Sequence, residues 1–113
     1  MKVIIAGSRT INDERILWEA IKEAPFNITE IVCGMAKGVD MLGHIYGYCN
    51  DLAVSEFPAN WDQHGKSAGY KRNVQMGEYA DSLIAIWDGQ SKGTKHMIDI
   101  MKKLNKPVSI YYV

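Results

Sequence analysis

The feature that most constrains the fold is an alternation of short apolar runs with segments of helical periodicity. Most of these runs lead into a turn rich in glycine or polar residues, after which a helical pattern begins. Short, nearly continuous apolar runs are typical of strands that are buried on both faces. The sequence predicts strands over residues 3–6, 30–33, 53–57, 82–87 and 107–112.

Four helical patterns separate the predicted strands. The first has Thr10 or Asn12 as its candidate cap, and the last two cover residues 69–79 and 94–104. Strands that alternate with helices at this spacing need crossover connections, which place helices on both faces of a parallel sheet. The sequence therefore predicts an α/β fold with three layers and a mostly parallel five-stranded sheet. We expect a single domain over residues 1–113.

Composition narrows the class of partner. The chain has 13 basic and 13 acidic residues, so its net charge of zero creates no general attraction for a polyanion, and nucleic acid is disfavoured. Neither cysteine lies at the spacing of a metal site, and we expect no metal. The first apolar run is too short for a signal segment, and no run approaches the ~20 apolar residues of a membrane span. We therefore expect a cytoplasmic protein with no membrane partner and no cofactor.

Three turns at the carboxyl ends of predicted strands combine glycine with side chains suited to phosphate: residues 7–9, 34–40 and 88–94. In a parallel sheet these ends meet at one edge, where ligands bind at the point at which the strand order reverses. One such turn is compatible with simple turn geometry or a helix cap, but three together favour a bound nucleotide or phosphosugar. Neither a P-loop ending nor a G-x-G-x-x-G pattern is present, which disfavours an ATPase and a standard dehydrogenase.

The segment over residues 58–69 has no helical or alternating pattern and is longer than the usual connection. Because it contains Trp61, His64 and Lys66, we predict an ordered lid or wall beside the site. His64 suits proton transfer near neutral pH, or it is solvent-exposed without a chemical role. Trp61 and Trp87 could each stack on a base or pack against the protein.

Five short motifs, taken in chain order, carry a family resemblance. They are Gly7-Ser8-Arg9, residues 33–40, residues 57–61 with 64–69, Arg72-Asn73 with Met76, and Asp88-Gly89 with Gly93-Thr94. Together they resemble the YspA-type (YpsA-related) branch of the SLOG superfamily, which also holds the DNA-processing DprA/Smf proteins and the Lonely-guy phosphoribohydrolases. The resemblance spans nearly the whole chain. It implies a Rossmann-like fold with a nucleotide or nucleotide-derived ligand at the strand ends.

The chain departs from the Lonely-guy pattern at a catalytic position. Those enzymes carry a Pro-Gly-Gly-x-Gly-Thr-x-x-Glu motif whose glutamate supports cleavage of the base–ribose bond, and the matching position here is Met97. A thioether cannot act as an acid or a base, whereas Arg72 matches the arginine that precedes the motif and can clamp phosphate. The resemblance therefore implies binding rather than catalysis. Met35 and Tyr70 replace a usual glycine and a usual proline of the YspA-type pattern.

These observations predict a small nucleotide-binding protein whose glycine-rich turns hold phosphate and ribose. An alternative is a hydrolase of the N-glycosidic or a phosphoester bond, in which Asp40 or Asp88 replaces the missing glutamate, although Asp40 also suits a helix cap. A DprA-like binder of single-stranded DNA is a further alternative, which the zero net charge disfavours. The aromatic end Tyr111-Tyr112 suits the edge of a homodimer. The expected ligand-binding residues are Gly7, Ser8, Arg9, Gly34, Lys37, Gly38, Asp40, Arg72, Asn73, Asp88, Gly89, Gly93 and Thr94.

Overall fold

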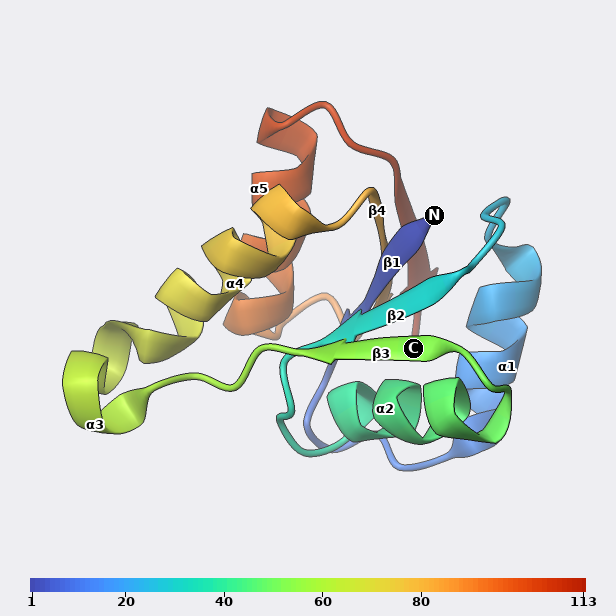
Figure 1. Cartoon of the computed structure of the whole chain (residues 1–113), viewed down its shortest axis with the longest axis horizontal. Coiled ribbons are helices and arrows are strands. Elements are labelled where there is room, and N and C mark those ends of the chain that lie inside the picture. Colours follow the sequence, from blue (N-terminus) through green and yellow to red (C-terminus); the bar gives the residue numbers. More distant parts are fainter.

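A computed structural model describes residues 1–113, in which strands and helices alternate along the chain (Figure 1). The strands are β1 (Lys2–Gly7), β2 (Glu30–Cys33), β3 (Ala53–Glu56), β4 (Ser82–Trp87) and β5 (Val108–Tyr112). The helices are α1 (Glu14–Glu23), α2 (Val39–Cys49), α3 (Trp61–His64), α4 (Ala68–Tyr79) and α5 (Lys92–Lys103). None of them has both the length and the apolar content that crossing a bilayer requires.

The five strands form one parallel sheet in the order β3-β2-β1-β4-β5. Strand β1 lies at its centre, where Ile4 is opposite Val32 on one side and Leu83 on the other. The predicted α/β class and Rossmann-like topology are confirmed, and the sheet is entirely rather than mostly parallel.

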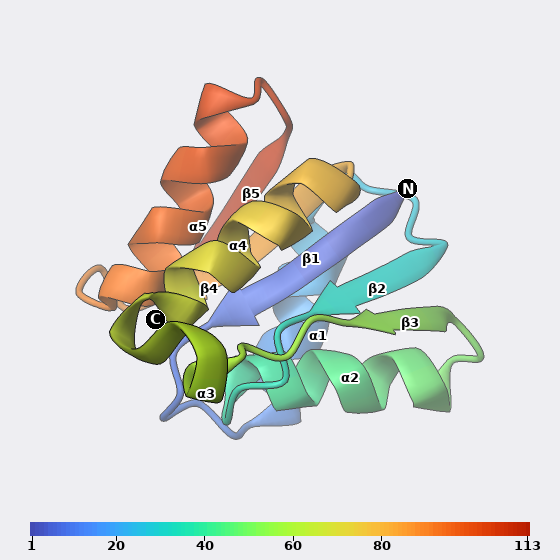
Figure 2. The same cartoon turned by 60° about the vertical axis from the view of Figure 1, so that its left-hand side comes forward.

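Alternate side chains of the strands build two separate cores. Val3 and Ile5 face α1 and α2, whereas Ile4 and Ala6 face α4 and α5. The sheet is thus the middle of three layers, as the two cartoon views show (Figures 1 and 2). Burial of both faces explains why the central strands β1 and β4 are almost entirely apolar and do not alternate with polar residues.

Helix boundaries account for the main differences from the predictions. Helix α1 is capped by Asp13, whose Oδ1 accepts from the backbone N–H of Arg15 at 3.0 Å, and not by Thr10 or Asn12. The segment over residues 58–69 is not an irregular loop, because it holds α3 and a 3-10 turn over Gly65–Ser67. Asn60 starts α3 by accepting from the N–H of Gln63 at 3.1 Å, a side-chain cap that needs no apolar periodicity.

Candidate functional site

A cavity of about 330 Å³ opens beyond the carboxyl ends of β1 and β4, where the strand order reverses. This is the position at which open α/β sheets bind their ligands. Its walls are the turn after β1 (Ala6, Gly7, Ser8, Arg9, Thr10), the turn before α2 with its first helical turn (Ala36, Asp40), α4 (Arg72, Asn73, Met76) and the start of α5 (Ser91, Gly93, Thr94, Met97). The three predicted turns therefore meet at one edge of the sheet.

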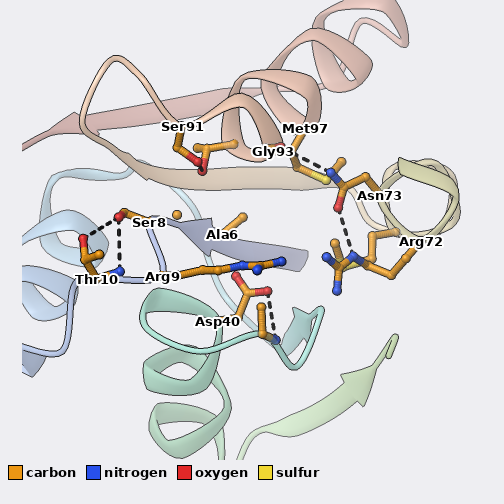
Figure 3. A pocket seen from close by; sticks show the side chains of 14 residues that line it. Ala6, Ser8, Arg9, Thr10, Asp40, Arg72, Asn73, Ser91, Gly93 and Met97 are labelled. Atoms are coloured by element: carbon orange, nitrogen blue, oxygen red, sulfur yellow. Dashed lines mark hydrogen bonds between the residues drawn. The ribbon is translucent and has the colours of Figure 1, made fainter. Parts of the chain in front are cut away.

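The turn after β1 is held by backbone bonds on both sides. The N–H of Ser8 donates to the carbonyl of Ile86 on β4 at 3.3 Å, and the carbonyl of Ser8 accepts from the N–H of Val39 on α2 at 3.2 Å. The buried hydroxyl of Ser8 lies 2.8 Å from that of Thr10, so two hydroxyls are presented together at the cavity wall (Figure 3).

The turn before α2 contains two residues in the left-handed region. Gly38 has φ 77°, and a Cβ at this position would lie 2.4 Å from the carbonyl oxygen of Ser8. Met35 has φ 61°, a conformation that favours glycine, which accounts physically for the glycine usual at this position of the motif. The turn directs the first residues of α2, and with them Asp40, toward the cavity.

Asp40 and Arg72 are charged side chains that are almost fully buried at the cavity wall, with 6% and 9% of their surface exposed. Desolvation raises the pKa of Asp40 to about 6, although Arg72 and a backbone N–H of Ala36 at 3.4 Å favour the charged form. Desolvation also lowers the pKa of Arg72, whose Nη1 donates to the carbonyl of Gly34. The site thus combines one carboxyl of altered acidity with a guanidinium fixed in place.

A chain of hydrogen bonds fixes Asn73 between α4 and α5. Its Oδ1 accepts from Arg72 Nε at 3.0 Å, so its Nδ2 donates to the carbonyl of Gly93 at 3.3 Å and to Nδ1 of His96 at 3.2 Å. This arrangement requires His96 Nδ1 to be an acceptor, and partial burial of the ring lowers the pKa of His96 in agreement with that. The orientation of Arg72 is therefore tied to the start of α5.

Helix α5 presents its N-terminus to the cavity. The backbone N–H groups of Lys92, Gly93 and Thr94 have no protein partner, as is usual in the first turn of a helix. The hydroxyls of Ser91 and Thr94 lie 3.1 Å apart beside them, and Thr94 is 4% exposed. Unpaired N–H groups, hydroxyls and the positive end of the helix dipole form a site suited to an anion.

Met76 and Met97 provide an apolar part of the cavity wall. Met97 is 1% exposed and occupies the position at which the Lonely-guy motif has glutamate. Asp40 is consequently the only carboxyl that lines the cavity.

Most of the predicted binding residues line this cavity, and the remaining ones lie around it. Gly34 and Lys37 line a neighbouring cavity with Trp61, and Lys66 lines a third one. Of the residues predicted to form a lid or wall, Trp61 and Lys66 line these neighbouring cavities. His64 lines none of the three, and its Nδ1 lies 3.2 Å from Lys71 Nζ.

Gly38, Asp88 and Gly89 line none of these three cavities. The carboxylate of Asp88 accepts from the N–H groups of Gln90 and Ser91, both at 2.8 Å, and these bonds lower its pKa. Asp88 therefore shapes the turn that positions Ser91. No group of three or more His, Cys, Asp or Glu side chains is arranged to hold a metal ion.

The predicted binding set does not contain Ala6, Thr10, Ala36, Met76, Ser91 or Met97, although all six line the cavity. Ser91 lies within the third predicted turn, and its hydroxyl is one of the side-chain groups there that suit phosphate oxygens. Thr10 also carries a hydroxyl, but its position equally suits a helix cap, and Ala36 has no polar side chain.

Comparisons with known proteins cover both halves of the chain. The model of the YAcAr family, described as "YspA, cpYpsA-related SLOG family", matches residues 1–64. The "Gene 61 protein" of Mycobacterium phage D29 is 30% identical over 117 residues, an alignment that covers 95% of this chain and 93% of that protein. No solved structure matches the chain. The family match includes the turns after β1 and β2, and the match to the phage protein extends to nearly the whole chain.

Proposed function

We propose that this chain, which belongs to the YspA, cpYpsA-related SLOG family, binds a phosphorylated nucleoside beyond the carboxyl ends of β1 and β4. Family membership implies a nucleotide-related ligand in general terms. The specific proposal is that the phosphate lies at the N-terminus of α5 and the ribose beside Asp40.

The observation that carries this proposal is the meeting of several anion-binding groups around one cavity. The unpaired N–H groups of α5, the hydroxyls of Ser8 and Thr94, and the guanidinium groups of Arg9 and Arg72 all lie at its walls. Phosphate oxygens are acceptors that these donors can satisfy together. The volume of about 330 Å³ is at the small end of the usual range for ligand cavities, which suits a mononucleotide.

Asp40 suits the ribose because its carboxylate can accept hydrogen bonds from sugar hydroxyls. It is the only carboxyl in the cavity, so it can distinguish a hydroxyl-bearing sugar from the phosphate that the arginines attract. Met76 and Met97 supply apolar surface for the remaining part of the ligand.

A thermal-unfolding screen against the four 5′-ribonucleoside monophosphates tests the proposal. A ligand present at 100 times its dissociation constant stabilises the protein by about 2.7 kcal/mol. Arg9 is exposed and makes no hydrogen bond within the protein, so Arg9→Gln is expected to weaken binding by roughly tenfold without unfolding the chain.

The matched control is Arg15→Gln, which removes an exposed arginine of α1 that pairs with the capping residue Asp13 and does not line the cavity. This variant is expected to bind as the unaltered protein does. The proposal fails if none of the four monophosphates raises the unfolding temperature, or if both arginine variants weaken binding equally.

One observation favours a second candidate function, hydrolysis of the bond between base and ribose. Asp40 is a buried carboxyl in the cavity with its pKa raised to about 6, and such a group can transfer protons near neutral pH. The test is to incubate each bound nucleotide with the protein and to search for free base by chromatography. Release of base that Asp40→Asn abolishes would support hydrolysis, whereas intact nucleotide after prolonged incubation leaves binding alone.

A further inference from the structure

A second cavity of about 410 Å³ adjoins the first and has a different character. Three cations, Arg9, Lys37 and Arg72, line it together with the indole of Trp61, and none of its lining residues is acidic. Arg9 and Arg72 also line the first cavity, so the two spaces meet at these two guanidinium groups.

The two arginines flank a position suited to an anion. Figure 3 shows the side chain of Arg9 lying beside Asp40 with its guanidinium group directed toward that of Arg72. Their mutual repulsion contributes to the lowered pKa of Arg72, and Asp40 is the only acidic group beside them. Arg72 is held by Gly34 and Asn73, whereas Arg9 has no hydrogen-bond partner. An anion between the two guanidinium groups would relieve this repulsion.

Trp61 supplies a flat aromatic surface next to these cations. The side chain stands at the first residue of α3, and the residue is 52% exposed. It also lines a third cavity of about 240 Å³ with Arg9, Lys66 and Tyr70, so that both outer cavities have the indole in their walls. A Cβ built on Gly69 would lie 3.5 Å from Cη2 of Trp61, which places the indole above the start of α4.

We infer that the ligand has two ring-bearing halves joined by a diphosphate, with the second ring stacked on Trp61. This inference rests on the proposed function, because the first half is the nucleotide of the inner cavity. The diphosphate extends from the N-terminus of α5 to the space between Arg9 and Arg72, and Lys37 adds a third cation on the outer side. Base–aromatic stacking tolerates any base, so Trp61 selects for a planar ring and not for its identity.

Calorimetry with a graded set of ligands tests this inference. The probes are the four 5′-ribonucleoside monophosphates, their di- and triphosphates, and the four symmetrical dinucleoside 5′,5′-diphosphates. The dinucleoside diphosphate of the preferred base is expected to bind at least about tenfold more tightly than any of its mono-, di- or triphosphates, since only the dinucleoside reaches Trp61. Trp61→Ala is expected to remove this gain, and Trp61→Phe to retain most of it.

Trp18→Ala is the matched control, because Trp18 is 53% exposed on α1 and lines neither of these cavities. It is expected to leave the gain unchanged. The inference is overturned if the triphosphate binds as tightly as the dinucleoside, which would indicate a cationic channel for phosphate only, or if Trp61→Ala keeps the gain. In either case the monophosphates still bind, so the proposed function stands; if no monophosphate binds, the proposed function itself fails.

Discussion

Asp40 is the residue whose acid–base chemistry the fold alters most. Desolvation raises its pKa from 3.8 to about 6, against the opposing effects of Arg72, the N–H of Ala36 and Arg9. The carboxyl thus changes its charge in a pH range in which most carboxyls stay ionised. Because it is the only acidic group lining the inner cavity, its protonation also changes the net charge that an incoming anion meets.

The first prediction concerns the pH dependence of stability. The folded state prefers the protonated form of Asp40, because the pKa of this carboxyl is higher in the folded than in the unfolded chain. The stability that this preference contributes is fully present below pH 3.8 and is lost as the pH rises to about 6. Asp40→Asn is uncharged at every pH and escapes this loss. Relative to the unaltered protein it should gain up to about 3 kcal/mol between pH 4 and pH 7, measured by urea unfolding without ligand.

Asp88→Asn provides a contrast of opposite sign. The N–H groups of Ser91 and Gln90 lower the pKa of Asp88. The stability that the ionised carboxylate contributes is therefore present at neutral pH and is lost as the pH falls through the acidic range. This variant should be less stable than the unaltered protein at pH 7 and should approach it at low pH. If the difference in stability between Asp40→Asn and the unaltered protein did not change with pH, the raised pKa assigned to Asp40 would be contradicted.

The second prediction concerns His96, whose Nδ1 accepts from Asn73. Asn73→Asp replaces that donor with a carboxylate, which favours a protonated imidazole. The pKa of His96, lowered in the unaltered protein, should therefore rise above its ordinary value of 6.5 in the variant. Titration by NMR measures this, with the signals of His44 and His64 as internal references. An unchanged titration of His96 would mean that the hydrogen bond from Asn73 is absent in solution.

At the scale of the element, the turn that leads into α2 carries the strictest backbone requirement. Gly38 and Gly89 both have positive φ, at 77° and 81°. They differ in their surroundings, because a Cβ at Gly38 would overlap the backbone of Ser8 and Arg9, whereas nothing lies within 4 Å of a Cβ at Gly89. A glycine with positive φ is thus closely surrounded in one turn and has open space around it in the other.

The third prediction uses this pair of glycines. Gly89→Ala should lower the free energy of unfolding by about 1 kcal/mol, the cost of the left-handed conformation alone. Gly38→Ala should lower it by about 3 kcal/mol, because the clash with the turn after β1 is added to that cost. It should also weaken nucleotide binding by moving Ser8. Equal losses in the two variants, measured by urea unfolding, would show that the backbone of Ser8 can move away without cost.

The strands and helices could be predicted where burial leaves a continuous or periodic pattern of apolar residues in the sequence. Strands β1 and β4 are buried on both faces, and their apolar runs identify them directly. Helix α3 could not be predicted, since four residues are too few for a helical period and its cap, Asn60, is equally common in turns. The start of α1 was misplaced because several polar residues before it can all cap a helix, and only the structure selects Asp13.

The site could be predicted in outline for a related reason. Glycine and polar residues after a strand mark the ligand edge of a parallel sheet, so Ser8, Arg9 and Thr94 could be identified from their positions alone. Whether a turn faces the cavity depends on packing between distant elements, and this is why Asp88 was grouped with residues that line it. Ala36 contributes through its backbone, for which no residue type is a signal.

At the scale of the whole molecule, the two halves of the sheet depend on each other. Strand β1 pairs with β4 along its length, and the core that contains Ile4 and Ala6 is completed by α4 and α5. The part of the chain that the family model matches, residues 1–64, contains β1 but ends before β4, α4 and α5.

The fourth prediction follows from this dependence. A fragment of residues 1–64 would leave one face of β1 and β2 uncovered and would lack Arg72, Asn73 and Thr94 of the site. We expect it to show no cooperative thermal transition by circular dichroism and no binding of any monophosphate, whereas the full chain shows both. A folded fragment would mean that the matched region is an independent unit and that the second core is dispensable.

The position of the cavity at the reversal of strand order also determines when in folding a ligand can first bind. Ser8 directly follows the first strand to be synthesised, and Thr94 lies in the last crossover, so the walls meet only after distant segments have paired. Parallel pairing between distant segments is a slow step, and partly assembled chains at that stage offer no complete cavity. A nucleotide should therefore leave the folding rate almost unchanged and slow the unfolding rate, so that it prolongs the lifetime of finished molecules without guiding their assembly.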